Sequence, residues 1–429
     1  MLVAAPGASG AFIQQGEKLT GQGEVGTAEA GESVALSADG NTALIGGPCD
    51  GHSSVQERCG VGAVWVFTRV GSTWIQQGNK LTGAREIGSG EFGAAVALSA
   101  NGNTALVGAP RDRHGVGAVW VFTRTGSTWT DQGEKLVPGA KNSTQKPRFG
   151  SSVALSEDGN AALIGGDFDR HGRGAAWVFT RTGTAWSRQG SKLSASDEKG
   201  KAEFGFSVAL SADGNTALIG GPFDGHLEGA AWVFTRTGSV WAQQGSKLTG
   251  ACKAEQGSEG FRGAFGSGVA LSGDGNTALI GQPWCGVFNC VGPHCQYVGR
   301  AYAFARSGSV WAQQGKSFTS RVEGFGEGDT PGFAASMRLS ADGNTALIAE
   351  PGTCYEGFLC VPGQAWEFAR SGETWTQQGE AITGSGEVEG EYNSVRFGES
   401  VALSTDAKTA LIGGPGDNER IGAAWVFVQ

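Results

Sequence analysis

Four of the five histidines in this sequence follow an aspartate at the same spacing. The pairs are Asp50 and His52, Asp112 and His114, Asp169 and His171, and Asp224 and His226. An imidazole beside a carboxylate can bind a metal or a polar ligand, and it can move protons near neutral pH. A structural interpretation stays open, because aspartate often hydrogen-bonds to the backbone of its own turn and a duplicated segment copies its motifs with or without use.

A second group of candidate residues is aromatic and lies in two insertions. Segment 283–299 contains Trp284, Phe288, His294 and Tyr297, and segment 351–363 contains Tyr355, Glu356 and Phe358. Large rings on stapled loops would form a rigid recognition patch, which suits a sugar or a protein surface. The alternative is a small satellite core in which the same rings pack around cystines.

All eight cysteines lie outside the regular part of the sequence, and an even number in loops predicts disulfides in an oxidising compartment. We expect Cys49 to pair with Cys59 and Cys354 to pair with Cys360. The other four, which form two more bridges of open connectivity, are Cys252, Cys285, Cys290 and Cys295. A zinc site made by these four is the alternative, although their spacing differs from the usual Cys-x2-Cys hooks.

The elements that position these loops belong to one segment that recurs seven times. Two apolar runs, 34–37 and 42–45, flank a turn at Asp39-Gly40, and the turn residue returns at Asn101, Asp158, Asp213, Asp274, Asp342 and Asp406. This pattern predicts an antiparallel hairpin. A third run around Trp65 and a more polar fourth run from Trp74 complete a four-stranded blade, and we expect the recurring tryptophans to pack between blades.

The two ends of the chain predict a closed ring. The last copy stops after its third run, whereas residues 12–21 match residues 74–83 with no strands of their own before them. We therefore expect an all-β fold, a seven-bladed β-propeller of four-stranded antiparallel blades, in which the N-terminal strand completes the C-terminal blade. The expected units are 1–21 (outer strand of blade 7), 22–83 (blade 1), 84–138 (blade 2), 139–194 (blade 3), 195–250 (blade 4), 251–320 (blade 5), 321–384 (blade 6) and 385–429 (first three strands of blade 7).

Phe92-Gly93 followed by Gly108-Ala109-Pro110 resembles the FG-GAP repeat of integrin alpha-chain heads, and Phe-Gly pairs recur at 149, 204, 265 and 397. The resemblance implies a seven-bladed propeller with an extracellular binding or adhesion role. The sequence departs from family members that bind calcium in the first hairpin through Asp-x-Asp/Asn-x-Asp-Gly, because the hairpin here reads Ser-Ala-Asp-Gly-Asn. One carboxylate is too few for Ca²⁺, so we expect no metal and no cofactor there.

Charge and hydropathy exclude several classes of partner. The net charge is -9 and no Lys/Arg run occurs, so we expect no nucleic acid. No apolar stretch is long enough to span a bilayer, so we expect no membrane insertion. The start lacks a charged segment followed by an apolar one, and we expect that any export signal has been removed. The expected protein is a secreted or surface-displayed monomer.

These observations favour a binding module that recognises carbohydrate or protein through the face carrying the long loops. One alternative is a polysaccharide lyase or glycosidase that uses the Asp/His groups near the channel mouth, which would require two groups to converge. No Gly-x-Ser-x-Gly elbow, Walker loop or His-Glu-x-x-His motif supports an enzyme. Another alternative is an architectural unit of a larger surface protein.

Overall fold

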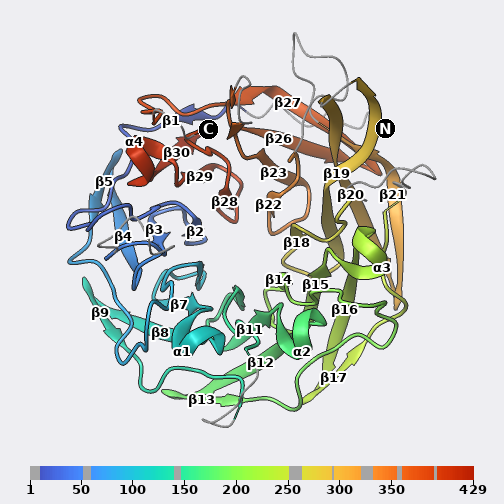
Figure 1. Ribbon diagram of the computed structural model, residues 1–429, viewed down its shortest axis with the longest axis horizontal. Coiled ribbons are helices and arrows are strands. Elements are labelled where there is room, and N and C mark those ends of the chain that lie inside the picture. The colour runs from blue at the N-terminus through green and yellow to red at the C-terminus, as the bar shows by residue number, and fades with distance from the viewer. Residues whose placement is uncertain are drawn as a thin grey trace, which may run out of the picture.

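The computed structural model describes residues 10–51, 59–139, 146–250, 263–291, 294–319, 332–354, 360–390 and 394–429, with the backbone alone at 286–291, 294–298, 353–354 and 360–361. It forms a ring of seven four-stranded antiparallel sheets around an axial channel (Figure 1). Successive blades contact each other through their innermost strands, and the seventh contacts the first. The predicted fold class is confirmed.

The strands run outward from the channel in chain order. Blade 1 contains β2 (Ser33–Leu36), β3 (Thr42–Gly47), β4 (Ala63–Val70) and β5 (Thr73–Gln76); blade 2 contains β6 (Ala95–Leu98), β7 (Thr104–Ala109), β8 (Ala118–Thr125) and β9 (Thr128–Asp131); blade 3 contains β10 (Ser152–Leu155), β11 (Ala161–Gly166), β12 (Ala175–Thr182) and β13 (Ala185–Arg188). Blade 4 contains β14 (Ser207–Leu210), β15 (Thr216–Gly221), β16 (Ala230–Thr237) and β17 (Val240–Gln243); blade 5 contains β18 (Val269–Leu271), β19 (Thr277–Val291), β20 (His294–Ser307) and β21 (Val310–Phe318).

Blades 6 and 7 complete the ring. Blade 6 contains β22 (Ser336–Leu339), β23 (Thr345–Glu350), β26 (Gln364–Ser371) and β27 (Thr374–Ile382), with a small extra sheet of β24 (Thr353–Cys354) and β25 (Cys360–Val361); blade 7 contains β28 (Ser400–Leu403), β29 (Thr409–Gly414), β30 (Ala423–Val428) and β1 (Ile13–Gln14). Four short turns, α1 (Asp112–Gly115), α2 (Asp169–Gly172), α3 (Asp224–Leu227) and α4 (Asp417–Arg420), join the second strand to the third. The face that carries these turns is called the loop face below (Figure 1).

The blades adhere because each one buries its apolar faces against its neighbours. Val64 and Val66 of β4 pack in one cluster with Phe92 and Trp120 of blade 2. The rings of Phe92 and Trp120 meet edge to face with centroids 5.5 Å apart. The same pair recurs around the ring, for example as Phe149 and Trp177. The predicted packing of the third-strand tryptophans between blades is confirmed.

Close backbone contact is the second link between blades. A Cβ atom on Gly46 of blade 1 would lie 2.1 Å from the carbonyl oxygen of Gly93 of blade 2, so only glycine fits. The hydroxyl of Ser33 donates to the same carbonyl at 2.7 Å. The Phe-Gly motif of blade 2 therefore forms the close backbone contact with blade 1.

The ring closes as the sequence predicts. Ile13 pairs with Val428 and Gln14 with Phe427, so β1 becomes the fourth strand of blade 7. The hydroxyl of Ser400 donates to Gly31 at 2.7 Å, which repeats at the junction the bond that Ser33 makes within the ring.

A chain that begins at residue 22 should lose at least about 3 kcal/mol of unfolding free energy, because it lacks the buried Leu19 and leaves β30 as an open edge. A synthetic peptide of residues 10–21 should restore the thermal midpoint, whereas a scrambled peptide should not. Calorimetry measures both. Equal midpoints for the shortened and full chains would contradict the closure.

Candidate functional site

The Asp-x-His segments form tight left-handed turns on the loop face. In α1, Arg113 and His114 have φ angles of 52° and 58°, and α2 and α3 repeat this geometry. The His114, His171 and His226 side chains are exposed, whereas the aspartates of the same turns are buried. The two members of each pair therefore occupy different environments. His52 lies outside the described residues.

The aspartates are held by lysines that follow the outer strand of the same blade. The ion pairs are Asp50 with Lys80 at 2.6 Å, Asp112 with Lys135 at 2.8 Å, Asp417 with Lys18 at 2.6 Å, Asp169 with Lys192, and Asp224 with Lys247. Asp112 also accepts the backbone N–H of Ile87 at 2.8 Å, in the loop that enters its blade. These carboxylates tie loops to blades, which favours the structural interpretation for Asp50, Asp112, Asp169 and Asp224. Their assignment to a ligand site stays a prediction.

Blades 5 and 6 lack both members of this ion pair. Their positions for the aspartate hold Cys285 and Thr353, and their positions for the lysine hold Ser317 and Ala381. Their outer strands β21 and β27 extend to nine residues each. Because the two residues are lost together in both blades, the repeat pattern alone contains a signal that aspartate and lysine act as a pair.

Of the aromatic residues expected to form a recognition patch, only the side chain of Trp284 is described. It is half-buried, and its backbone bridges to Gly263. The side chains of Phe288, His294 and Tyr297, and all of Tyr355, Glu356 and Phe358, lie outside the described part. The patch on these insertions therefore stays a prediction.

The structure contains the predicted disulfide between Cys49 and Cys59. Cys285 is also disulfide-bonded, which does not fit a zinc-thiolate site at that residue. Cys354 and Cys360 stand opposite each other in the register of β24 and β25. Their side chains, those of Cys290 and Cys295, and all of Cys252 lie outside the described residues, so these pairings stay predictions.

The axial channel opens on the loop face through a rim of seven equivalent positions. The rim residues are Glu32, Ala94, Ser151, Phe206, Ser267, Ala335 and Glu399, each just before an innermost strand. They line an outer cavity of about 340 Å³ that continues into an inner cavity of about 200 Å³. The two glutamates stand on adjacent blades 1 and 7, and Phe206 stands on the opposite side of the ring, on blade 4.

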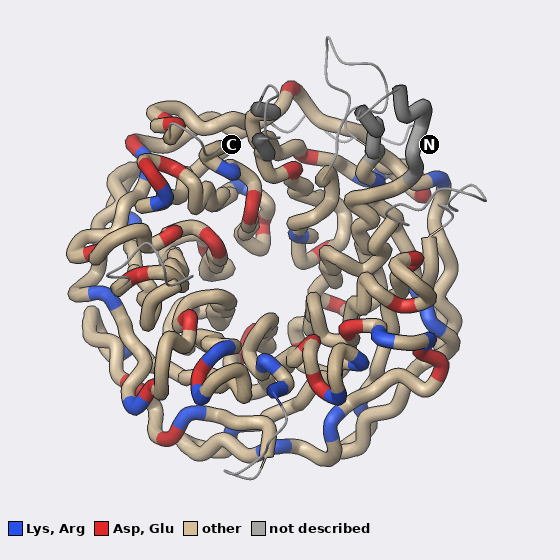
Figure 2. The backbone as a smooth tube through the Cα atoms, in the orientation of Figure 1, with Lys and Arg blue, Asp and Glu red and all other residues tan. Residues whose placement is uncertain are grey.

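Charged groups crowd the rim. Arg396 lies 2.9 Å from Glu399 and 3.5 Å from Glu32. Burial and the neighbouring Glu399 raise the pKa of Glu32 to about 7, against the lowering effect of Arg396. Burial likewise raises the pKa of Asp167, which lines the same cavity and lies 3.5 Å from Arg148. Figure 2 shows acidic and basic segments interspersed around the ring.

Three phenylalanines are exposed on the loop face of blades 3 and 4. Phe206 is 42% exposed at the rim, and Phe168 and Phe223 are 39% and 38% exposed at equivalent positions of neighbouring blades. The guanidinium of Arg148 lies over the ring of Phe168. The sequence interpretation missed these residues, although Phe206 breaks the small or acidic pattern of the other rim positions.

One close trio of potential metal ligands occurs within the described residues. It consists of Glu29, Cys49 and Cys59, whose two sulfurs are joined in a disulfide. In the first hairpin, Asp39 accepts hydrogen bonds from Ser37 Oγ at 2.5 Å and from the Asn41 backbone at 3.0 Å. This carboxylate shapes the hairpin, as the sequence predicts.

Blade 6 carries a buried carboxyl where most blades have glycine. Glu350 ends β23 at the position of Gly47 and Gly414, and its side chain is 3% exposed. Burial raises the pKa of Glu350 to about 8. Burial thus favours the protonated form of this carboxyl in the folded chain.

The ring and its rimmed channel define a β-propeller of the repeat type, a fold that in general supports a binding module. A family model of the FG-GAP repeat matches residues 186–234, which run from β13 into β16. This match and the seven blades agree with an FG-GAP seven-bladed propeller. No curated protein matches the chain. Within the described residues, no helix has the length and apolar character needed to cross a membrane.

Replacing Asp112 by Thr should cost about 3 kcal/mol of unfolding free energy, because Lys135 then keeps a poorly solvated charge without a partner. Adding Lys135→Ala recreates the Thr and Ala combination of blade 6 and should recover about 2 kcal/mol of that loss. Denaturant titration of both single variants and the double variant measures this coupling. Additive losses would show that the pair does not act as a unit.

The free energy of unfolding should fall as pH rises from about 5 to 8. Glu350 causes this fall, because it keeps its proton in the folded chain at pH values where the unfolded chain has lost it. Glu350→Gln stays neutral and should exceed the wild type by about 3 kcal/mol at pH 9, with little difference at pH 4. Glu373→Gln, at an exposed turn of the same blade, is the control. Parallel stability profiles for Glu350→Gln and wild type would exclude the effect.

Proposed function

We propose that this chain is a secreted or surface-displayed, monomeric binding module that recognises carbohydrate at the channel mouth on its loop face. The observation that carries the proposal is the composition of the rim. Phe206 offers an exposed ring on one side of a cavity of about 340 Å³, and the carboxylates of Glu32 and Glu399 stand on the other side. A concave site with an apolar surface and a few polar groups is typical of small-ligand recognition.

The chemistry of a sugar matches this arrangement. The C–H face of a pyranose packs on an aromatic ring, and its hydroxyl groups donate to carboxylates and accept from a guanidinium. Glu399 supplies such an acceptor and Arg338 such a donor, since both line the cavity, and Arg396 holds the Glu399 carboxylate at 2.9 Å. Asp167 adds a carboxylate that lines the same cavity.

Two other functions have weaker support. A protein ligand would use the aromatic insertions 283–299 and 351–363, which interrupt the repeat on adjacent blades. A lyase or glycosidase would need a free Asp/His pair, but lysines hold Asp50, Asp112, Asp169 and Asp224.

Phe206→Ser gives blade 4 the serine that blades 3 and 5 carry at the same rim position, Ser151 and Ser267. It should weaken glycan binding at least about tenfold with a nearly unchanged thermal midpoint. Glycan-array binding followed by calorimetric titration of each bound oligosaccharide measures the effect. Val240→Ala, exposed on the outer strand of the same blade, is the matched control. No bound glycan, or equal affinity for Phe206→Ser, would refute the proposal, and release of new reducing ends from a bound glycan would replace it with an enzyme.

A further inference from the structure

One innermost strand breaks the pattern of the other six. The strands read Ser-Val-Ala-Leu or a close variant, whereas β22 reads Ser336-Met337-Arg338-Leu339. At the position of Arg338 the other blades carry Ala35, Ala97, Ala154, Ala209, Ala270 and Ala402. A long cation thus replaces a methyl group at one point of an otherwise apolar ring.

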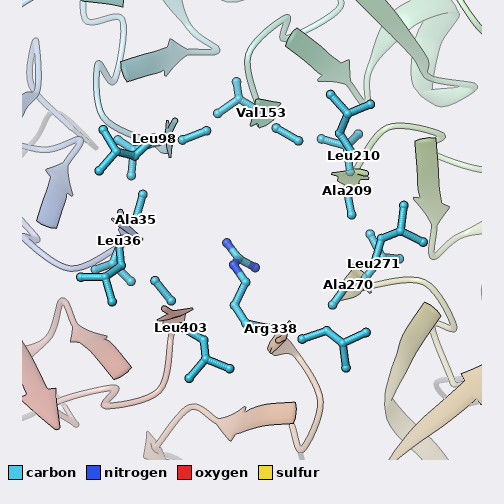
Figure 3. Close-up of a pocket in the computed structure, with 18 residues that line it drawn as sticks. Ala35, Leu36, Leu98, Val153, Ala209, Leu210, Ala270, Leu271, Arg338 and Leu403 are labelled. Atoms are coloured by element: carbon cyan, nitrogen blue, oxygen red, sulfur yellow. The ribbon is translucent and has the colours of Figure 1, made fainter. Parts of the chain in front are cut away.

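The Arg338 side chain extends into the axial channel. Figure 3 shows its guanidinium directed toward the channel centre, with Leu36, Leu98 and Leu210 among the surrounding wall residues. The other residues that line the inner cavity of about 200 Å³ are valines, alanines and leucines. Arg338 is therefore the one charged residue of the described lining of that cavity. Its side chain is accessible from the open channel, so a ligand can reach it.

The guanidinium lacks an anionic partner within the described chain. Its Nη1 donates a hydrogen bond to the carbonyl oxygen of Met337 at 2.9 Å. No described carboxylate lies within 4.0 Å of its nitrogens, and the rim carboxylates of Glu32 and Glu399 pair with Arg396. The enclosing ring lowers the pKa of the Arg338 guanidinium from its usual value by desolvation, although arginine stays charged. An unpaired charge between apolar walls is costly unless a ligand or water neutralises it.

We propose that the inner channel binds a small organic monocarboxylate with a compact apolar body. The carboxylate accepts two parallel hydrogen bonds from the Arg338 guanidinium, and the apolar body packs against the valines and leucines that encircle the channel. A single cation matches one negative charge, so a dianion such as phosphate would keep an unpaired charge in an apolar wall. The site lies below the rim and goes beyond the proposed carbohydrate function.

The test compares wild type with Arg338→Ala, which restores the residue of the other six blades and should fold with an equal or higher thermal midpoint. The probes are hexanoate and benzoate, with hexanamide and benzamide as neutral counterparts. Wild type should bind the carboxylates at least about tenfold more tightly than the amides, and Arg338→Ala should lose that preference. Arg188→Ala, at an exposed outer strand, removes one charge elsewhere and should bind as wild type does.

Titration calorimetry and the ligand-induced shift of the thermal midpoint provide two readouts. Equal binding of carboxylate and amide by wild type would overturn the proposal, as would unchanged carboxylate affinity in Arg338→Ala. Failure of wild type to bind either carboxylate at millimolar concentration would also overturn it and would assign Arg338 a packing role alone. Because Arg338 also lines the outer cavity, the carboxylates are titrated into Phe206→Ser as well, which should bind them as wild type does even if it loses glycan binding.

Discussion

Neighbouring blades touch backbone to backbone where the Phe-Gly motif of one blade meets the glycine at the end of the second strand of the other. At Gly46 and Gly93 no side chain fits, and the adjoining Phe92 ring packs against Trp120. Since a single blade cannot bury both of its apolar faces, this contact must recur around the whole ring. The channel, its rim and the loop face exist because this approach recurs around the ring, with local changes: Gly281 meets Ala334 between blades 5 and 6, and blade 6 carries Ala349 at the glycine position.

The repeated and the singular residues of this ring have different roles. Asp112, Lys135 and their counterparts recur in five blades because the aspartate anchors the loop that enters the blade. The two charges neutralise each other in this ion pair. Arg338 stands where the other six blades carry alanine, Phe206 stands where the others carry small or acidic residues, and Glu350 stands where four blades carry glycine. Phe206 and Arg338 line the channel, so their side chains extend into open space and leave the packing between blades in place.

The sequence predicted the blades and the closing strand, because these depend on the recurring apolar runs and on the match between residues 12–21 and 74–83. It did not predict that Asp112 is buried, since burial depends on a lysine of another strand. It also missed Arg338, although the departure from Ser-Val-Ala-Leu is visible. Recognising its role requires the knowledge that the innermost strand presents its residues to the channel, which is a property of the closed ring.

The pairing of β1 with β30 also has a mechanical consequence. Ile13 pairs with Val428, so the two antiparallel strands leave the ring side by side at the same end of their ladder. Tension applied through both chain ends would load the hydrogen bonds of this short ladder one after another, as in a zipper, rather than all together in shear. The pairing of β1 with β30 would therefore break before any of the blades whose four strands are consecutive in the chain, and the ring would open at blade 7.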